Sequence, residues 1–202
     1  MIKAVLFDMD GVLVSSFEAF YHATNGMLAK YGKKAVSRRE FLRHYWGTYI
    51  MDDLKKMTGR KGTRRAYNEF FRLFYGMGKH VRAYPDARPV LRKLGKAYKL
   101  AIITNTPAGP ARFILRAAGL GGMFDAIATG DIVRHPKPAP DIVLLACRRL
   151  RVRPDEAVVV GDMTHDVRSG RSAGALTVGV RRGIGADRYS SLKGLPRLLG
   201  NI

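Results

Sequence analysis

Cysteine is nearly absent from this sequence, whose 202 residues contain only Cys147. A single cysteine cannot form an internal disulfide, which excludes a disulfide-stabilised secreted scaffold. Cys147 follows the apolar run 142–146 on a helical pattern. We therefore expect a small buried core residue there and not a catalytic thiol.

Long hydrophobic stretches are also missing. No apolar run approaches the roughly 20 residues that a membrane-spanning helix needs, and the first strand pattern begins directly after the N-terminus, which leaves no room for a signal peptide. We expect a cytoplasmic protein without membrane contact. An apolar content of 47% over 202 residues predicts a folded chain with one domain and a smaller insertion.

Acidic residues are scarce: 16 Asp and Glu face 36 Lys and Arg, which gives a net charge of +20. Such an excess can reflect a nucleic-acid partner, an anionic substrate or the composition of a whole proteome. The basic residues are spread along the chain in short clusters such as Lys33-Lys34 and Arg148-Arg149, as on solvated surfaces. We expect at most weak, salt-sensitive nucleic-acid binding. A basic nucleic-acid-binding protein is the alternative from another functional class.

Two of the few acids stand together at the start of the chain. Asp8 and Asp10 follow the apolar run 4–7 and precede Gly11. Residues i and i+2 of an extended segment point the same way, so both carboxylates can converge on one small volume. Their repulsion is relieved by a cation or by a shared proton. The pattern predicts a divalent metal or paired nucleophile and acid/base work, and the simpler alternative is an Asx turn that ends the strand.

Further polar groups come after later strand patterns or in turn-rich loops. In open parallel sheets, ligands bind at the edge formed by the carboxyl ends of the strands. The motif of Asp8 and Asp10 and the three later signals, taken in this order, predict one site. Its further members are Thr104, Asn105, Lys137, Asp162 and Asp166.

The order of the expected elements predicts an α/β fold. Strand patterns vanish between about 15 and 84, where apolar residues recur at helical spacing. From 85 onward helix and strand alternate, which is typical of βαβ units and a parallel sheet. We predict a Rossmann-like parallel-sheet core formed by 1–14 and 85–202, with an all-α helical bundle, 15–84, inserted in it.

The individual elements are predicted as follows. The insertion should contain helices at 17–28, from the capping box at Ser37 to Trp46, at 52–57 and at 66–77. The core should contain helices at 87–96, 109–118, 138–150 and 165–173, and strands at 99–104, 125–128, 157–161 and 175–179. A closing helix at 191–199 should be interrupted by Pro196.

With these motifs in this order, the sequence resembles the haloacid dehalogenase superfamily of phosphotransferases. More narrowly, it is similar to the branch of phosphoglycolate phosphatase and β-phosphoglucomutase, over essentially the whole chain. Asp8-Met9-Asp10-Gly11 resembles the first family motif, Thr104 the second, Lys137 the third, and Gly161-Asp162 through Asp166 the fourth. The resemblance implies that 15–84 is a mobile helical cap.

The resemblance also implies roles for the two leading acids. Asp8 would attack phosphorus and form an aspartyl-phosphate, and Asp10 would protonate the leaving oxygen and later activate water. A hard cation, Mg²⁺, would bind the Asp8 carboxylate, the Asp10 backbone carbonyl and the Asp162 carboxylate. Asp166 would hold water or Lys137.

The remaining motif residues would bind phosphate. Thr104 and the Asn105 amide would contact the transferring phosphoryl oxygens, and Lys137 would offset the negative charge that builds in the transition state. His135 and His165 have no assigned role, and exposed loop positions are expected for both.

The function predicted is hydrolysis of a small phosphorylated metabolite by a Mg²⁺-dependent phosphatase, monomeric or homodimeric. Phosphoglycolate is the leading substrate by analogy. A β-phosphoglucomutase-like phosphotransferase and a pyrophosphatase remain alternatives. The segment 46–50 is unlike a mutase substrate loop, which favours the phosphatase.

Overall fold

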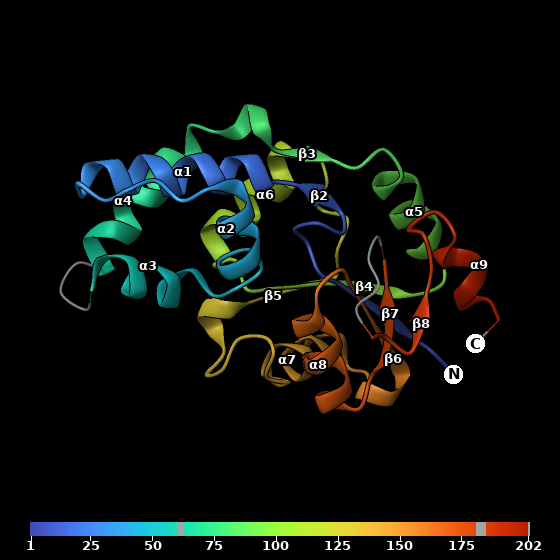
Figure 1. Cartoon of the computed structure of the whole chain (residues 1–202). Coiled ribbons are helices and arrows are strands. Elements are labelled where there is room, and N and C mark those ends of the chain that lie inside the picture. Colours follow the sequence, from blue (N-terminus) through green and yellow to red (C-terminus); the bar gives the residue numbers. More distant parts are fainter. Residues whose placement is uncertain (60–62, 181–184, 202) are drawn as a thin grey trace.

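A sheet of six parallel strands lies at the centre of the structure, a computed structural model that describes residues 1–59, 63–180 and 185–201 (Figure 1). The strand order is β5-β4-β1-β6-β7-β8. Parallel neighbours require crossover connections, and helices supply most of them. The strands are β1 (Ala4–Phe7), β4 (Lys99–Thr104), β5 (Ala126–Thr129), β6 (Ala157–Gly161), β7 (Leu176–Gly179) and β8 (Arg188–Tyr189).

Alternation of side chains along the strands divides the core into two layers. Val5 and Phe7 of β1 face one side, Ala4 and Leu6 face the other, and all four are fully buried. The first side is covered by α5 (Ala87–Leu94), α6 (Ala108–Ala117) and α9 (Leu195–Leu199), the second by α7 (Asp141–Leu150) and α8 (Thr164–Ala173). This α/β/α arrangement confirms the predicted Rossmann-like core.

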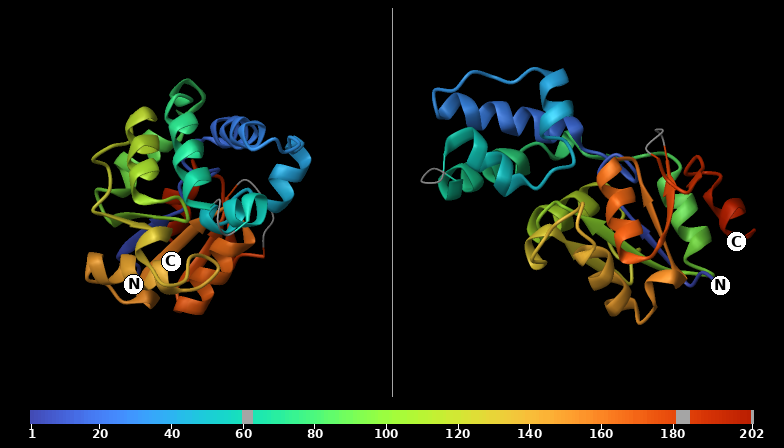
Figure 2. Two further views of the ribbon diagram at one scale, coloured as in Figure 1. Left: turned by 90° about the vertical axis from the view of Figure 1, so that its left-hand side faces the viewer. Right: turned by 60° about the horizontal axis from the view of Figure 1, so that its bottom comes forward.

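The helical insertion lies beside this sheet and at one end of the molecule (Figure 2). Its helices interlock through aromatic side chains: the Phe20 and Phe74 rings lie 4.6 Å apart, and Phe70 and Phe74 are fully buried. The predicted all-α insertion is thereby confirmed. The helices are α1 (Phe17–Lys30), α2 (Arg38–His44), α3 (Ile50–Thr58) and α4 (Thr63–Tyr75).

Two short strands that the sequence does not predict carry the chain into and out of the insertion. β2 (Val14–Ser15) pairs antiparallel with β3 (Arg82–Ala83). The Tyr84 backbone N–H extends this link by donating to the Leu13 carbonyl at 3.0 Å. Two residues are too few to show the alternation by which a strand is recognised in sequence.

Proline explains where the helix boundaries differ from those predicted. The helix expected from 138 begins only at Asp141, because the preceding turn contains Pro136, Pro138 and Pro140. The closing helix, expected from 191, begins at Leu195. Pro196 lies in its first turn, where the missing N–H costs nothing, so the predicted interruption is wrong.

Within the described residues, strand β8 and three short 3₁₀ helices are additions to the predicted elements. Both residues of β8 are exposed, so no apolar alternation marks it in the sequence. Among the helices that the structure describes, none has the length and apolar character needed to cross a bilayer. The 3₁₀ helices are η2 (Gly78–His80), η3 (Gly130–Ile132) and η4 (Pro154–Glu156).

Candidate active site

The carboxyl ends of three neighbouring strands bring the motif residues to one edge of the sheet. β1 pairs with both β4 and β6. Asp8 follows β1, Thr104 ends β4 and Asp162 follows β6, so the fold converts separation in sequence into proximity. The exposed fractions of these three residues are only 7%, 2% and 2%. Polar groups this deeply buried require partners or a ligand.

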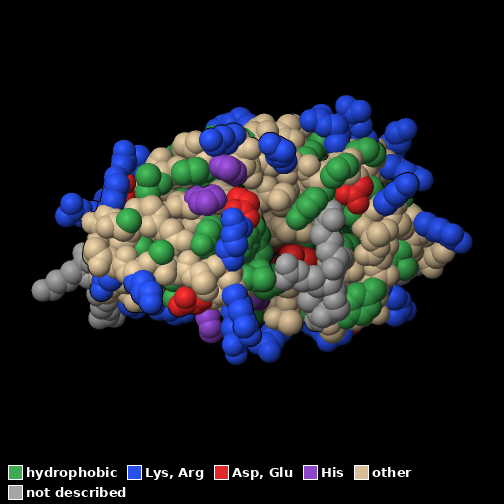
Figure 3. Space-filling model, turned by 45° about the horizontal axis from the view of Figure 1, so that its top comes forward, with side chains coloured by type: hydrophobic (Ala, Val, Ile, Leu, Met, Phe, Trp, Pro, Cys, Tyr) green, Lys and Arg blue, Asp and Glu red, His purple; other side chains and the backbone are tan. Residues whose placement is uncertain are grey.

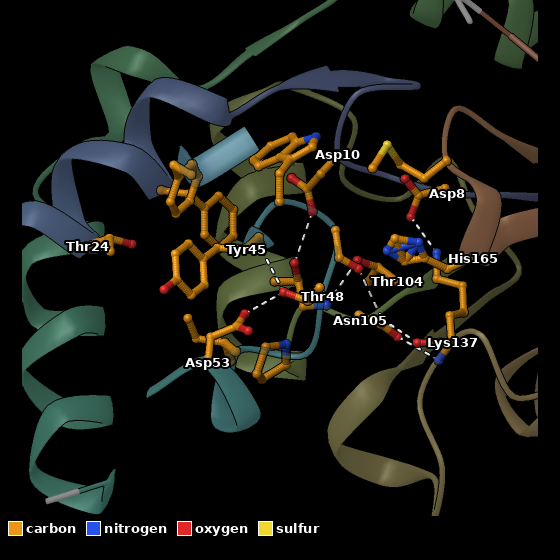
Figure 4. Close-up of a pocket in the computed structure, with 18 of the residues that line it drawn as sticks. Asp8, Asp10, Thr24, Tyr45, Thr48, Asp53, Thr104, Asn105, Lys137 and His165 are labelled. Atoms are coloured by element: carbon orange, nitrogen blue, oxygen red, sulfur yellow. Dashed lines mark hydrogen bonds and ion pairs between the residues drawn. The ribbon is translucent and has the colours of Figure 1, made fainter. Parts of the chain in front are cut away.

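Lys137 lies at the centre of an ion-pair network at this edge (Figure 4). Its Nζ donates to Asp8 Oδ1 at 2.7 Å, to Asp166 Oδ1 at 2.7 Å and to the Ile103 carbonyl at 2.9 Å. These bonds use all three ammonium hydrogens. Burial alone lowers the pKa of Lys137, but the carboxylates of Asp166 and Asp8 raise it above its usual range. Lys137 is therefore a fixed positive charge.

Asn105 fixes the loop that carries Lys137. Its Oδ1 accepts from the Lys137 backbone N–H at 2.9 Å, and its Nδ2 donates to the Lys137 carbonyl at 3.0 Å. Nδ2 also donates to the carbonyl of Gly47 in the insertion at 3.2 Å. The side-chain amide of Asn105 thus connects the Lys137 loop to the insertion.

Asp10 is held by two hydroxyl groups. Ser16 Oγ donates to Asp10 Oδ1, and Thr106 Oγ1 donates to Asp10 Oδ2 at 2.9 Å. Burial raises the pKa of Asp10, and both hydrogen bonds oppose this effect. The sequence identified neither hydroxyl residue. The position of Thr106 two residues after Thr104 is the only signal that could have indicated it.

Three buried carboxylates form a cluster beside Lys137. One oxygen each of Asp8, Asp162 and Asp166 lies within 4.8 Å of the others. Burial raises the pKa of Asp8, Lys137 opposes the shift, and the carboxylates of Asp166 and Asp162 add to it. A hard divalent cation would relieve this repulsion, and an all-oxygen donor set fits Mg²⁺.

Two glycines give the acids room. Gly11 has a φ of +89°, and a Cβ there would lie 2.5 Å from Asp162 Oδ2. A Cβ on Gly161 would lie 2.2 Å from the Asp166 Cβ. Asp166 Oδ2 accepts from the Met163 backbone N–H at 3.0 Å. Asp166 therefore caps α8 through one oxygen and pairs with Lys137 through the other.

Residues of the insertion form the opposite side of the same pocket, which we call the insertion wall (Figure 4). The helical spacing of apolar residues in 15–84 predicts only a helical bundle there and no pocket lining. Phe20 and Trp46 do pack together, with ring centroids 5.8 Å apart, but they also face the pocket. The insertion wall consists of Phe20, Thr24, Phe41, Tyr45, Trp46, Gly47, Thr48, Ile50, Asp53 and Met57.

Asp53 is the one acid in the insertion wall, and the sequence did not single it out. It is 2% exposed. Its Oδ2 accepts from Thr48 Oγ1, whereas its Oδ1 has no hydrogen-bond partner among the described residues. Burial raises the pKa of Asp53 to about 7, against the opposing hydrogen bond from Thr48.

Of the two exposed loop positions expected for histidines, the one for His165 is wrong, because His165 lies half-buried in α8. His165 lines the pocket, and burial lowers its pKa. His135 is exposed in the loop before α7, where its Nδ1 lies 3.2 Å from Asp141 Oδ2. Cys147 is buried in α7, and burial raises its pKa to about 11, as for an unreactive core thiol.

Comparison with known proteins agrees with these motifs. The family model described as haloacid dehalogenase-like hydrolase matches residues 5–180. Pyrophosphatase PpaX of Bacillus velezensis is 33% identical over 188 residues, which cover 89% of this chain and 83% of that protein. Phosphoglycolate phosphatase of Nitrosospira multiformis is 33% identical over 184 residues, 86% of this chain and 81% of that protein.

A solved structure shows the same architecture. CbbY from Rhodobacter sphaeroides superposes with a TM-score of 0.86 at 25% identity and covers 96% of each chain. The resemblance read from the four motifs is therefore confirmed, and the chain belongs to the haloacid dehalogenase-like hydrolases.

Proposed function

We propose that this protein is a Mg²⁺-dependent phosphatase that hydrolyses a small phosphorylated metabolite through an aspartyl-phosphate. The observation that carries the proposal is the buried network in which Lys137 Nζ contacts both Asp8 Oδ1 and Asp166 Oδ1 at 2.7 Å. In this network the Asp8 carboxylate would accept the phosphoryl group, and the permanent charge of Lys137 would offset part of the negative charge of the carboxylates and the phosphate.

Asp8 is the proposed nucleophile. One of its carboxylate oxygens attacks phosphorus, a new P–O bond forms, and the bond to the leaving oxygen breaks. Lys137 holds Asp8 in place and offsets the charge that develops on the phosphoryl oxygens. Thr104 and Asn105 complete the proposed phosphate site at the end of β4.

Asp10 is the proposed general acid and base. Its pKa is raised by burial, which favours the protonated form that could donate to the leaving oxygen. The ionised carboxylate then accepts a proton from the water that attacks the aspartyl-phosphate. Ser16 and Thr106 each bond one carboxylate oxygen and fix the orientation of the group.

The proposed metal ligands are the carboxylates of Asp8 and Asp162 and the backbone carbonyl of Asp10. Asp166 lies in the same oxygen cluster, and its proposed role is to hold Lys137 through their ion pair. When bound, Mg²⁺ would neutralise the carboxylates and the incoming phosphate.

We propose further that residues 15–84 act as a cap over this site. Support comes from the pocket itself, which has the sheet edge on one side and the insertion wall on the other. The two connections between the sheet domain and the insertion lie side by side, because β2 pairs with β3. A hinge between the two parts would have to lie at these connections.

The named relatives supply the first substrates to test. Phosphoglycolate and pyrophosphate come from the phosphatase and pyrophosphatase relatives. A β-phosphoglucomutase-like transfer is the alternative reaction. It needs a second phosphate site, and the insertion wall contains no Lys or Arg among its described residues.

The test is a phosphate-release screen of purified protein against a metabolite panel. We expect turnover with Mg²⁺, loss of turnover with EDTA and recovery when Mg²⁺ is added back. Full activity in metal-free buffer would contradict the metal assignment. No release from any phosphate ester would contradict the function.

A further inference from the structure

The insertion wall is apolar although the chain as a whole carries a net charge of +20. Its described residues are aromatic and aliphatic side chains, a glycine, two threonines and the single carboxylate of Asp53. None is a lysine or an arginine. The part of a substrate that meets this wall would therefore find no positive charge there.

The sheet side of the pocket has no spare cation to offer either. Among the described residues that line the pocket, Lys137 is the one Lys or Arg, and Asp8, Asp166 and the Ile103 carbonyl already use its three hydrogens. An adjoining hollow is lined by Lys56 and Arg168, neither of which lines the pocket itself. Lys56 Nζ lies 3.9 Å from Asp53 Oδ1. A second anionic group on a substrate in the pocket would therefore meet the Asp53 carboxylate and not the Lys56 ammonium.

Asp53 is the polar group that the insertion wall offers. It is 2% exposed and lines the pocket. Oδ2 is bonded by Thr48, whereas Oδ1 has no hydrogen bond among the described residues and meets the exposed Lys56 Nζ only at ion-pair distance, 3.9 Å. A buried acceptor without a donor is costly, and a donor on a ligand would remove that cost.

Aromatic rings line the same pocket as Asp53. Tyr45 is one of them, and Figure 4 shows the Asp53 carboxylate directed toward Thr48. Phe20 and Trp46 lie within the same lining, in T-shaped contact with ring centroids 5.8 Å apart. Aromatic faces bind apolar groups and also attract cations. Rings combined with one buried carboxylate suit an apolar group that ends in a donor.

We infer that the substrate is a phosphate monoester whose organic part is apolar, carries no second anionic group, and bears an ammonium or hydroxyl group that donates to Asp53. This inference rests on the proposed phosphatase function and narrows its substrate class. It disfavours phosphoglycolate and pyrophosphate, because each carries a second anionic group.

Four synthetic esters separate these possibilities. They are phenyl phosphates that carry a para methyl, hydroxymethyl, aminomethyl or carboxyl group, each assayed for kcat/KM with Mg²⁺. The enzymes compared are the wild type, Asp53→Asn and, as a matched control, Asp52→Asn, which removes the same charge from an exposed neighbour in α3. Each ester has the same intrinsic reactivity with every enzyme, so wild-type to variant ratios isolate the contact.

Measured relative to Asp53→Asn, the wild type should favour the aminomethyl or hydroxymethyl ester over the methyl ester and should disfavour the carboxyl ester most. Asp53→Asn should lower kcat/KM for the preferred ester on the order of 10-fold or more, the methyl ester should lose least, and the carboxyl ester should gain. Asp52→Asn should keep the wild-type order. The larger of the two donor effects identifies ammonium or hydroxyl as the group bound.

Other results would overturn the inference. Equal losses for all four esters in Asp53→Asn would show a purely structural role, and a wild-type preference for the carboxyl ester would show a cationic subsite. Hydrolysis of phosphoglycolate or pyrophosphate but of none of the four esters would refute the substrate class and leave the phosphatase function standing. Absence of any Mg²⁺-dependent hydrolysis would refute the function itself.

Discussion

The two sides of the pocket differ in almost every physical respect. On the sheet side, charged groups are buried and bonded to one another, as in the contacts of Lys137 with Asp8 and Asp166. On the insertion wall, aromatic rings dominate, and Oδ1 of the one carboxylate, Asp53, has no hydrogen bond to any residue that the structure describes. We therefore propose that the sheet edge carries out the reaction and that the insertion selects the substrate. Changes on the sheet side should therefore abolish turnover, and changes on the wall should redirect it.

The largest effect is expected from Asp8→Asn. The asparagine keeps an oxygen that can accept from Lys137 but cannot form an acyl phosphate, so turnover should fall on the order of 10³-fold or more. Phosphate release and trapping of the phosphoenzyme measure the two losses. Asp155→Asn, at an exposed carboxylate remote from the pocket, is the control. Wild-type turnover in Asp8→Asn would show that the nucleophile is misassigned.

Asp10→Asn should have the next largest effect, a loss on the order of 10²-fold in kcat. The Asp10 backbone carbonyl remains, so Mg²⁺ affinity measured by calorimetry should change little. Because burial raises the pKa of Asp10, the wild-type rate should fall as pH rises through that pKa and the acid form disappears. The pH profile of Asp10→Asn should lack this limb, and an unchanged profile would remove Asp10 from the acid role.

Sequence alone predicts the sheet side of the site well. Asp8, Thr104 and Asp162 come at or just after the ends of strands, and a parallel sheet brings such ends together whatever the separation along the chain. Gly11 also follows from sequence, because the turn after the first strand needs a backbone freed from Cβ. The family resemblance could be recognised from the four motifs because each motif is a short local pattern.

The rest of the site depends on contacts that no local pattern encodes. Thr106 bonds Asp10 from 96 residues away, and Asn105 reaches Gly47 across 58 residues. Asp53 reads in sequence as one acid in the first turn of a helix. Only the packing of the insertion shows that it is buried and faces the pocket.

Asp53→Asn should also change how the free energy of unfolding depends on pH. Folding raises the pKa of Asp53 from 3.8 to about 7, so the unfolded chain ionises first and wild-type stability falls as pH rises from about 4 to about 7. Asparagine cannot ionise. The variant should therefore gain on the wild type by about 2 kcal/mol across this window, roughly half of full linkage. Urea unfolding at pH 4.5 and 8 measures it, and a constant difference would contradict the assignment.

A smaller effect is expected when the site is filled. Mg²⁺ with inorganic phosphate should slow hydrogen exchange in 15–84 more than in β6 and β7, because closure would bury the insertion wall. Such closure is expected on microsecond to millisecond times. Equal changes in both regions would indicate a static insertion, and the Asp8→Asn variant without metal provides the baseline.

The smallest effect concerns the basic residues outside the pocket. Figure 3 shows Lys and Arg side chains dispersed around the visible face, without one continuous basic patch. Charges arranged in this way neutralise phosphates without reading bases, so any binding to DNA or RNA should be weak, independent of sequence and steeply reduced by salt. Lys137 is 5% exposed and internally paired, so added salt should hardly screen its interactions with the carboxylates. Fluorescence anisotropy with two unrelated oligonucleotides, run beside phosphate release from 20 to 200 mM NaCl, should show binding lost while turnover persists. A sequence-selective complex at 150 mM salt, together with no turnover, would indicate that nucleic-acid binding at the surface, and not hydrolysis in the pocket, is the function of this chain.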